Sequence, residues 1–131
     1  MTLILPVLDE TNRPFWDGCR EAVLRLQRCA GCGTLRYPVS VLCPRCLSSD
    51  ARWEELSGRG EVYALAGFGR AYDDAWSGRV PYAVALVRLE EGPTMIGNLV
   101  EIDPTEARVG MAVEVSFEDA GEFALPVWRP A

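Results

Sequence analysis

The chain has 131 residues, 49% of them hydrophobic, and a net charge of −6 with thirteen arginines, nineteen acidic residues and no lysine or histidine. This composition is sufficient for the core of one domain or of two small units packed together. It excludes Ser-His-Asp and Cys-His catalytic sites, histidine metal ligands and Schiff-base lysine chemistry, and the acidic balance disfavours binding to duplex nucleic acid.

The N-terminal segment, "MTLILPVLDE", predicts neither a signal peptide nor a membrane span. It has no basic region and no small-residue cleavage site, and no apolar run in the sequence reaches about 18 residues. We therefore expect a cytoplasmic protein, in which closely paired cysteines stay reduced and are available to bind metal.

A short amphipathic helix is expected over about residues 13–23. Thr11 or Asn12 can cap its start, and Pro14 falls in its first turn, where a missing N–H costs little. The apolar positions follow helical spacing at Phe15, Cys19, Ala22 and Val23. Because Cys19 lies on this stripe, we expect it to be a buried, unreactive thiol.

Phe15 and Trp16 allow two interpretations. Aromatic residues dominate protein interfaces, so the pair could anchor the chain in a groove of a partner. Alternatively they pack the helix onto the rest of the fold, and we expect this for one of the two.

Two C-x-x-C pairs follow a predicted strand that alternates Leu24 and Leu26 with polar residues. The segment "CAGCGTLRYPVSVLCPRC" contains Cys29, Cys32, Cys43 and Cys46. Four cysteines at this spacing are typical of a tetrahedral zinc site, and a closed shell of four thiolates indicates a structural rather than a catalytic metal. The alternatives are disulfides or cysteines that no longer hold metal; a thioredoxin-like redox site would need a βαβ frame, which the pattern lacks.

The two cysteine turns differ in one position. Gly33 follows Cys32 and can adopt a left-handed conformation that turns its amide towards a sulfur, whereas Leu47 stands where a second glycine would be expected. Three arginines near the cysteines could offset the negative charge of the site or could simply be solvated: Arg28, Arg36 and Arg45.

From Gly58 onwards the pattern is that of β-strands separated by short turns. Five strands are predicted at residues 61–68, 81–90, 95–102, 111–119 and 123–128. Five strands in about 70 residues favour a small closed barrel of the OB type, with an SH3-like barrel as the competing topology. Segment 81–90 is apolar at nearly every position, so we expect it to be covered on both faces.

Residues 67–81, "GFGRAYDDAWSGRVP", form the longest predicted loop. Its aromatic and basic residues are Phe68, Arg70, Tyr72, Trp76 and Arg79. They could form a platform for a partner or for a ligand such as coenzyme A, whose phosphates arginines bind well. Alternatively the aromatic side chains fold back over the mouth of the barrel. Asp73 and Asp74 are interpreted as a turn or a cap and not as a catalytic pair.

The sequence resembles the small zinc-ribbon plus OB-fold proteins of domain-of-unknown-function family 35. The resemblance is carried, in order, by "RPFWDGCREAVLRLQRCAGCG", "CPRC", "WEELSGRGEVYA", "PYAVALVRLEEG" and "VGMAVEVSF". It implies a mainly β fold with an N-terminal arm and helix (1–27), a rubredoxin-like zinc ribbon (28–56) and a five-stranded OB barrel (57–131). It further implies structural Zn²⁺ held by the four paired cysteines.

The resemblance also implies a role beside enzymes of the thiolase superfamily that act on acyl-CoA substrates in lipid or steroid metabolism. We therefore expect a non-catalytic accessory subunit that forms a hetero-oligomer with an acyltransferase, thiolase or aldolase and contacts or covers its acyl-CoA site. Two alternatives remain at this point. One is a single-stranded nucleic-acid module built from the ribbon and the barrel, and the other is a small enzyme acting on acyl-CoA directly.

Overall fold

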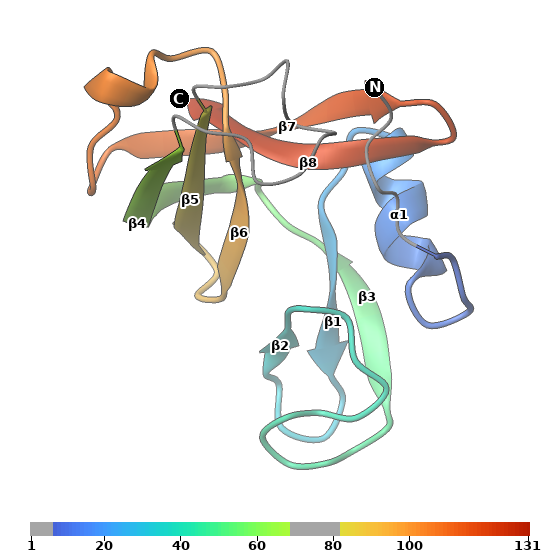
Figure 1. The fold of residues 1–131 in the computed structure, drawn as a ribbon. Helices are drawn as coiled ribbons and strands as arrows, with labels where there is room; N and C mark the ends of the chain where they lie inside the picture. The colour runs from blue at the N-terminus through green and yellow to red at the C-terminus, as the bar shows by residue number, and fades with distance from the viewer. Residues whose placement is uncertain (1–6, 69–81) are drawn as a thin grey trace.

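The computed structural model describes residues 7–68 and 82–131, and within them the chain forms one short α-helix and eight β-strands (Figure 1). The elements are α1 (Arg13–Arg20), β1 (Arg25–Cys29), β2 (Leu35–Arg36), β3 (Ala51–Glu55), β4 (Arg59–Phe68), β5 (Tyr82–Leu89), β6 (Thr94–Leu99), the 3-10 turn η2 (Pro104–Glu106), β7 (Ala112–Ala120) and β8 (Phe123–Pro130). The strands form a three-stranded sheet and a closed barrel. The predicted combination of a helical segment, a ribbon and a five-stranded OB-type barrel is confirmed.

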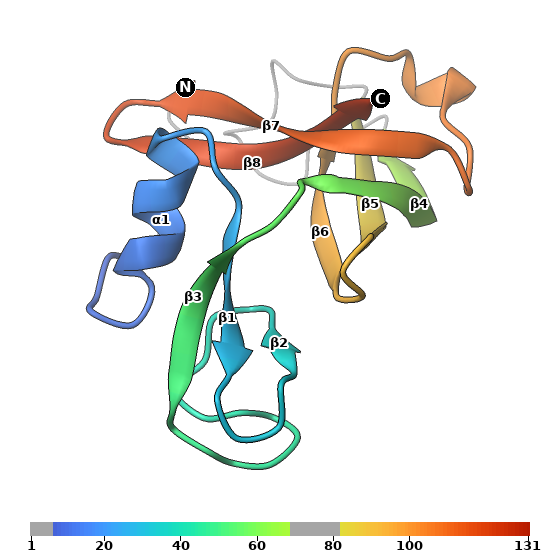
Figure 2. The same cartoon turned by 180° about the vertical axis from the view of Figure 1, so that it is seen from behind.

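The ribbon sheet has the order β2-β1-β3 with antiparallel pairing throughout. Gln27 of the central strand pairs with Arg36 on one side and with Trp53 on the other. Figures 1 and 2 show this sheet extending from beneath the β7–β8 hairpin, with the turns between its strands at the far end. Those turns carry the paired cysteines.

The barrel has the order β4-β5-β6-β8-β7 and closes through the pairing of β4 with β7. Neighbouring strands are antiparallel except β6 and β8, which run parallel and meet at Leu99 and Trp128. This order, in which β8 lies between β6 and β7, is that of the OB-type barrel, which the strand pattern favoured over an SH3-like barrel. Pro126 also lies in β8, but the pairing of β8 with β6 is at Trp128. The missing N–H of Pro126 therefore interrupts no hydrogen bond to β6.

The helix is shorter than expected. It ends at Arg20 because Ala22 adopts a left-handed conformation (φ 61°) and the amide of Val23 turns back to the carbonyl oxygen of Gly18 at 2.8 Å. Asn12 occupies the N-cap position, but its side chain accepts a hydrogen bond from the amide of Asp9 instead of from the helix. The predicted helix over 13–23 is therefore three residues too long.

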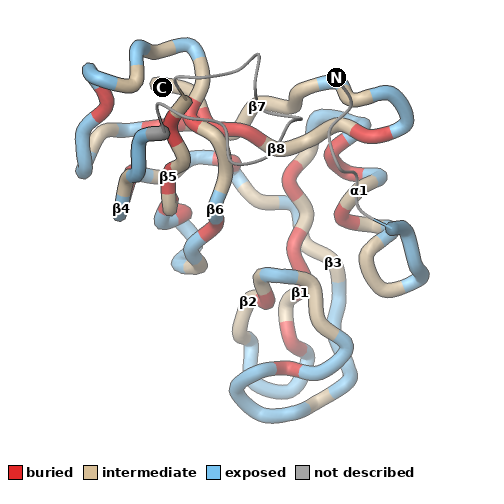
Figure 3. Tube along the Cα trace, viewed as in Figure 1, coloured by how far each residue is buried: buried red, intermediate tan, exposed pale blue. Residues whose placement is uncertain are grey.

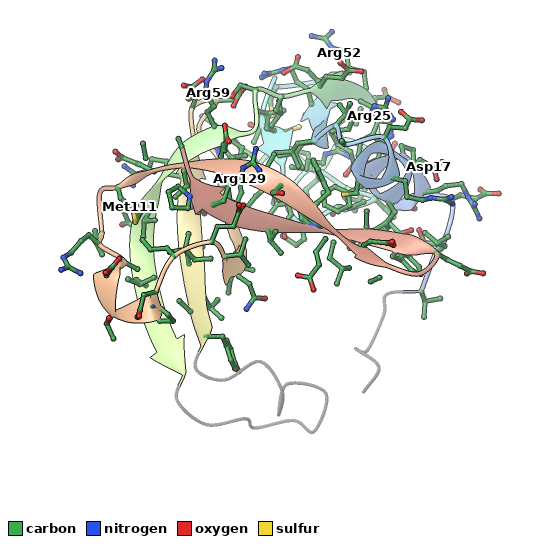
Figure 4. The ribbon with its side chains drawn as sticks, turned by 90° about the horizontal axis from the view of Figure 1, so that it is seen from above. Asp17, Arg25, Arg52, Arg59, Met111 and Arg129 are labelled. Carbon is green, nitrogen blue, oxygen red and sulfur yellow. The ribbon has the colours of Figure 1, made fainter. Side chains whose placement is uncertain are left out.

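Arg25 ties the end of the helix to the ribbon. Its guanidinium lies 2.7 Å from the carboxylate of Glu21 and 3.6 Å from that of Glu55, and Figure 4 shows it beside α1. The hydrogen bond to Glu21, followed by the charges of both carboxylates, raises the pKa of Arg25. These ion pairs link the C-terminal end of the helix to β1 and β3.

Strand β5 corrects another expectation. Its buried positions alternate with half-buried or exposed ones, so one face points into the barrel and the other, with Val84 and Leu86, lies on the outside. The neighbouring outward side chains Tyr63 of β4 and Ile96 of β6 are 52% and 60% exposed. Coverage on both faces is therefore not found within the described residues.

One hydrophobic core joins the helix, the ribbon and the barrel (Figure 3). It includes Phe15 and Cys19 from the helix, Leu26 from β1, and Val87 and Trp128 from the barrel. Cys19 is 1% exposed, which confirms the expected burial, and this burial raises the pKa of its thiol to about 12. No helix in residues 7–68 or 82–131 is both long enough and apolar enough to span a membrane.

Candidate metal centre

The four paired cysteines converge at the far end of the ribbon. Cys29 is the last residue of β1 and Cys32 lies in the turn that follows it, and Cys43 and Cys46 come from the loop between β2 and β3. All four sulfur atoms lie within 4.8 Å of one another, and the Sγ atoms are 3.5 Å apart for Cys29 and Cys46 and 3.6 Å apart for Cys32 and Cys43.

This geometry fits a tetrahedral metal. Thiolates at about 2.3 Å from zinc place neighbouring sulfurs about 3.8 Å apart. All five cysteines in the chain are free of disulfides, so the disulfide alternative is wrong. The four cysteines are positioned to bind a metal ion, and when bound the ion would supply a structural cross-link between the two turns.

The two cysteine turns have the same backbone form. The amide of Gly33 donates to the carbonyl oxygen of Cys29 at 3.0 Å, and the amide of Leu47 donates to that of Cys43 at 2.9 Å. Gly33 and Leu47 both have positive φ, 80° and 65°. The left-handed conformation predicted for Gly33 is confirmed, but its amide points to a carbonyl and not to a sulfur.

Backbone N–H groups favour the thiolate form at two of the cysteines. The amide of Cys32 is the main cause that lowers the pKa of Cys29 to about 6, with smaller contributions that include the side chain of Arg36. The amide of Cys46 is likewise the main cause that lowers the pKa of Cys43. Amides aimed at sulfur atoms are the usual outer partners of metal-bound cysteines.

The pKa of Cys46 is shifted in the opposite direction. The amide of Ser48 favours its thiolate, but the sulfur of Cys29, desolvation and the sulfurs of Cys32 and Cys43 together outweigh this and raise the pKa of Cys46 to about 12. Four thiolates this close repel one another. A divalent cation among them would remove that repulsion, so the donor set suits zinc in charge as well as in geometry.

The three arginines near the cysteines have different surroundings. Arg28 forms a two-pronged ion pair with Glu54 at 2.6 and 3.0 Å and also donates to the carbonyl oxygen of Gly33. Arg45 is exposed, and Arg36 is 1% exposed within the ribbon. Sequence reasoning treated the three alike, because nothing in their spacing signals that only one is buried.

Phe15 and Trp16 both pack against the rest of the fold, Phe15 in the core and Trp16 at its edge. Phe15 is 4% exposed in the core, while Trp16 is half-buried and its ring meets that of Phe123 edge-on at 5.7 Å. Both line a cavity of about 420 Å³ between α1, the ribbon and β8, together with Asp9, Thr11, Asn12, Tyr37, Pro38, Val39, Ser40, Val41 and Pro126. The packing interpretation therefore applies to both residues, and a partner contact of the exposed part of Trp16 remains a prediction.

The predicted loop platform falls mostly outside the described residues. Phe68 is the last residue of β4 and pairs with Tyr82, whereas Arg70, Tyr72, Trp76 and Arg79 lie outside the residues that the structure describes, as do Asp73 and Asp74. Their proposed contacts with a ligand or partner remain a prediction.

The ribbon also exposes apolar side chains that the sequence reasoning did not single out as surface groups. Val41, Leu42 and Leu47 are 63%, 47% and 71% exposed around the second cysteine pair. The sequence did contain a signal for this exposure. The loop is too short to form a core of its own, so apolar residues next to its cysteines were to be expected on the surface. We refer to these three residues as the ribbon patch.

Two family models match the chain. The model described as the rubredoxin-like zinc ribbon domain of ChsH2 matches residues 16–51, and the model described as the C-terminal OB-fold domain of ChsH2 matches residues 53–118. The first match contains all four paired cysteines and identifies their turns as a zinc ribbon, and the second contains the barrel strands β4 to β6 and most of β7.

Relatives of known name share most of the chain. A probable enoyl-CoA hydratase alpha subunit of Thermomonospora curvata is 38% identical over 96% of this chain and 39% of its own length. A DUF35 domain-containing scaffold protein of Methanothermobacter thermautotrophicus is 32% identical over 88% of this chain and 87% of its own length. The chain thus spans less than two fifths of the length of the hydratase subunits that it matches.

A solved structure described as the Ltp2-ChsH2(DUF35) aldolase contains a similar chain. It is 37% identical, superposes with a TM-score of 0.85, and the match covers 96% of this chain and 98% of that one. The similarity therefore includes the helix, the ribbon and the barrel together.

Proposed function

The chain belongs to the DUF35 family of zinc-ribbon and OB-fold proteins, and on that premise we propose that it is a non-catalytic accessory subunit of a thiolase-superfamily enzyme. In this role it binds an acyltransferase, thiolase or aldolase in a hetero-oligomer and helps to form or cover the acyl-CoA site. The partner supplies the nucleophile and the acid and base groups, and this chain supplies position and stability.

The observation that carries the proposal is the likeness to the Ltp2-ChsH2(DUF35) aldolase structure. That match extends over 98% of the other chain at 37% identity. The two chains therefore share the helix, the ribbon and the barrel, and not only a ribbon. The name of the Methanothermobacter thermautotrophicus relative, a scaffold protein, supports the same role.

The residue chemistry supports a role without catalysis. The sequence contains no histidine or lysine, so two common sources of a general base or an amine nucleophile are missing. Cys19 is buried with a pKa raised by desolvation, and the other four cysteines form the metal centre. We therefore assign no bond-making step to this chain.

Two regions are proposed to contact the partner or its substrate. The helical arm and the ribbon would dock the enzyme, since the ribbon patch exposes apolar surface and Trp16 lines an open cavity beside it. The barrel would face the acyl-CoA entrance through the loop residues Phe68, Arg70, Tyr72, Trp76 and Arg79. Zinc held by Cys29, Cys32, Cys43 and Cys46 would fix the shape of the docking ribbon.

Co-expression with the thiolase-like enzyme encoded nearest to this chain tests the proposal. A complex should elute as one species from a size-exclusion column at micromolar concentration, and the purified chain alone should turn over no acyl-CoA substrate. Separate elution of both proteins would contradict the proposal. Binding of single-stranded oligonucleotides tighter than about 1 μM at about 0.15 M salt would instead favour the nucleic-acid alternative.

A further inference from the structure

Arg36 is the one charged side chain that is buried in the part of the chain that the structure describes. Its guanidinium donates to the carbonyl oxygens of Ser40 at 3.2 Å, Ser48 at 2.8 Å and Asp50 at 3.2 Å. These carbonyls stand on both sides of the second cysteine pair. The side chain of Arg36 therefore holds together the two ends of the loop that carries Cys43 and Cys46.

Arg36 has no acidic partner among the described residues. The ion pairs found there involve Arg25, Arg28, Arg59 and Arg129, and Nε of Arg36 is buried without a hydrogen-bond partner. Carbonyl oxygens satisfy the Nη donors but do not neutralise the charge. A buried charge without a counter-charge is strongly unfavourable, so a compensating anion is to be expected.

The metal centre supplies that anion. Four thiolates around a divalent zinc ion leave an excess of negative charge, and Cys29 and Cys43 are as buried as Arg36. The carbonyl oxygens of Ser48 and Asp50, which Arg36 binds, also accept the backbone amides of Cys43 and Ala30 at 2.9 Å each, so the guanidinium is one backbone group away from both cysteine turns.

The two other arginines of the ribbon do not meet this requirement. The charge of Arg28 is balanced by Glu54 at 2.6 Å. The side chain of Arg45 is exposed, so solvent screens it, although its backbone amide lies 3.4 Å from Sγ of Cys43.

We propose that Arg36 is the internal counter-ion of the metal centre: its charge offsets the excess negative charge of the four thiolates and so sets the affinity of the ribbon for zinc. Arg36 is a positioning residue and not a ligand, because the four cysteines complete the tetrahedron. The proposal does not depend on which enzyme the chain binds.

The test compares zinc affinity in the full chain and in three variants, by competition with a chromophoric chelator. Arg36→Met removes the charge but keeps a side chain of similar length. Arg36→Lys keeps the charge but lacks the planar guanidinium group, and Arg45→Met is the control for an exposed arginine. We expect R36M to bind zinc about 10 to 100 times more weakly than the wild type, R36K to stay within about tenfold of the wild type and above R36M, and R45M to match the wild type.

Cobalt substitution adds a readout that a purely structural role would leave unchanged. Loss of a positive charge beside the sulfurs makes the thiolates better electron donors, so the sulfur-to-cobalt charge-transfer band of R36M should move to longer wavelength while that of R36K stays. Wild-type zinc affinity in folded R36M, or R36K as weak as R36M, would overturn the proposal. If R36M does not fold, R36K decides: affinity within about tenfold of the wild type supports the counter-ion role, and a larger loss rejects it.

Discussion

Leu47 adopts in the second cysteine turn the left-handed backbone conformation that Gly33 adopts in the first. Their φ angles are 65° and 80°, and each amide donates to the carbonyl oxygen of the first cysteine of its own pair. A leucine in this conformation costs about 1–2 kcal/mol that a glycine avoids, and the side chain of Leu47 is also 71% exposed. The strained backbone and the exposed side chain both fit the docking role proposed for the ribbon patch.

Replacement of Leu47 by glycine should stabilise the zinc-bound protein by up to about 1 kcal/mol, because relief of the left-handed strain exceeds the added entropy of the unfolded chain. Urea denaturation measures the difference in free energy of unfolding. Leu42→Gly is the matched control, since Leu42 is exposed but is not among the residues with positive φ; it should lose about 0.5–1 kcal/mol. Equal losses in both variants would show that Leu47 is not strained.

Removal of the metal should unfold the ribbon. Strand β2 has two residues, and the loop of the second cysteine pair depends on the metal centre, so zinc binding should supply much of the folding free energy of residues 25–55. We expect one zinc per chain by mass spectrometry, and loss of amide protection in this segment after chelation. Cys43→Ala should lose the zinc, whereas Cys19→Ala, which changes a cysteine outside the site, should keep it. A Cys43→Ala protein that retains one tightly bound zinc would disprove the four-cysteine site.

The ion pair of Arg28 and Glu54 should lower the measured pKa of the Glu54 carboxyl group. The hydrogen bonds from Arg28 lower the pKa of Glu54 below its ordinary value, against the opposing effect of desolvation. Since this pKa is lowered in the folded state, the pair stabilises the fold above the ordinary pKa of glutamate, and the contribution is lost as the pH falls through the lowered value. Carboxyl NMR should show the pKa of Glu54 rising in Arg28→Met. Arg52→Met should shift it less, because Arg52 contributes only a weaker charge effect.

Several features of the fold could be predicted because they depend on local patterns. The spacing of the four cysteines gave the metal centre, and the alternation of residues 111–119 gave a strand. The end of the helix, by contrast, depends on the left-handed turn at Ala22, and alanine has no preference for that conformation. The isolation of Arg36 likewise arises from the packing of β2 against the second cysteine loop, which sequence periodicity does not encode.

The barrel core contains a close approach that requires glycine. A Cβ atom at Gly97 would lie 3.1 Å from both Cδ1 and Nε1 of Trp128, whose side chain is fully buried. Gly97→Ala should therefore cost about 1–3 kcal/mol through overpacking, measured by urea denaturation. Gly67→Ala, where a Cβ would meet no atom within 4 Å, should cost nothing. If the two alanine variants unfold at the same urea concentration, the close contact is not important for stability.

The ribbon patch should be required for binding to the proposed partner. We expect the triple variant Val41→Ser, Leu42→Ser and Leu47→Asn to keep its zinc but to elute separately from an enzyme that co-elutes with the wild type. Asparagine is chosen at residue 47 because it tolerates the left-handed conformation, so that loss of binding reflects loss of apolar contact and not a change of backbone.

The matched control changes apolar residues of similar exposure on the barrel. Tyr63→Ser and Ile96→Ser remove side chains that are 52% and 60% exposed on the outer face of β4 and β6, and this double variant should still co-elute with the enzyme. If the barrel variant loses the partner while the ribbon variant keeps it, the enzyme docks on the outer face of the barrel. In that case the strain at Leu47 needs another explanation, and the half-buried outer positions of β5 would become the centre of the interface.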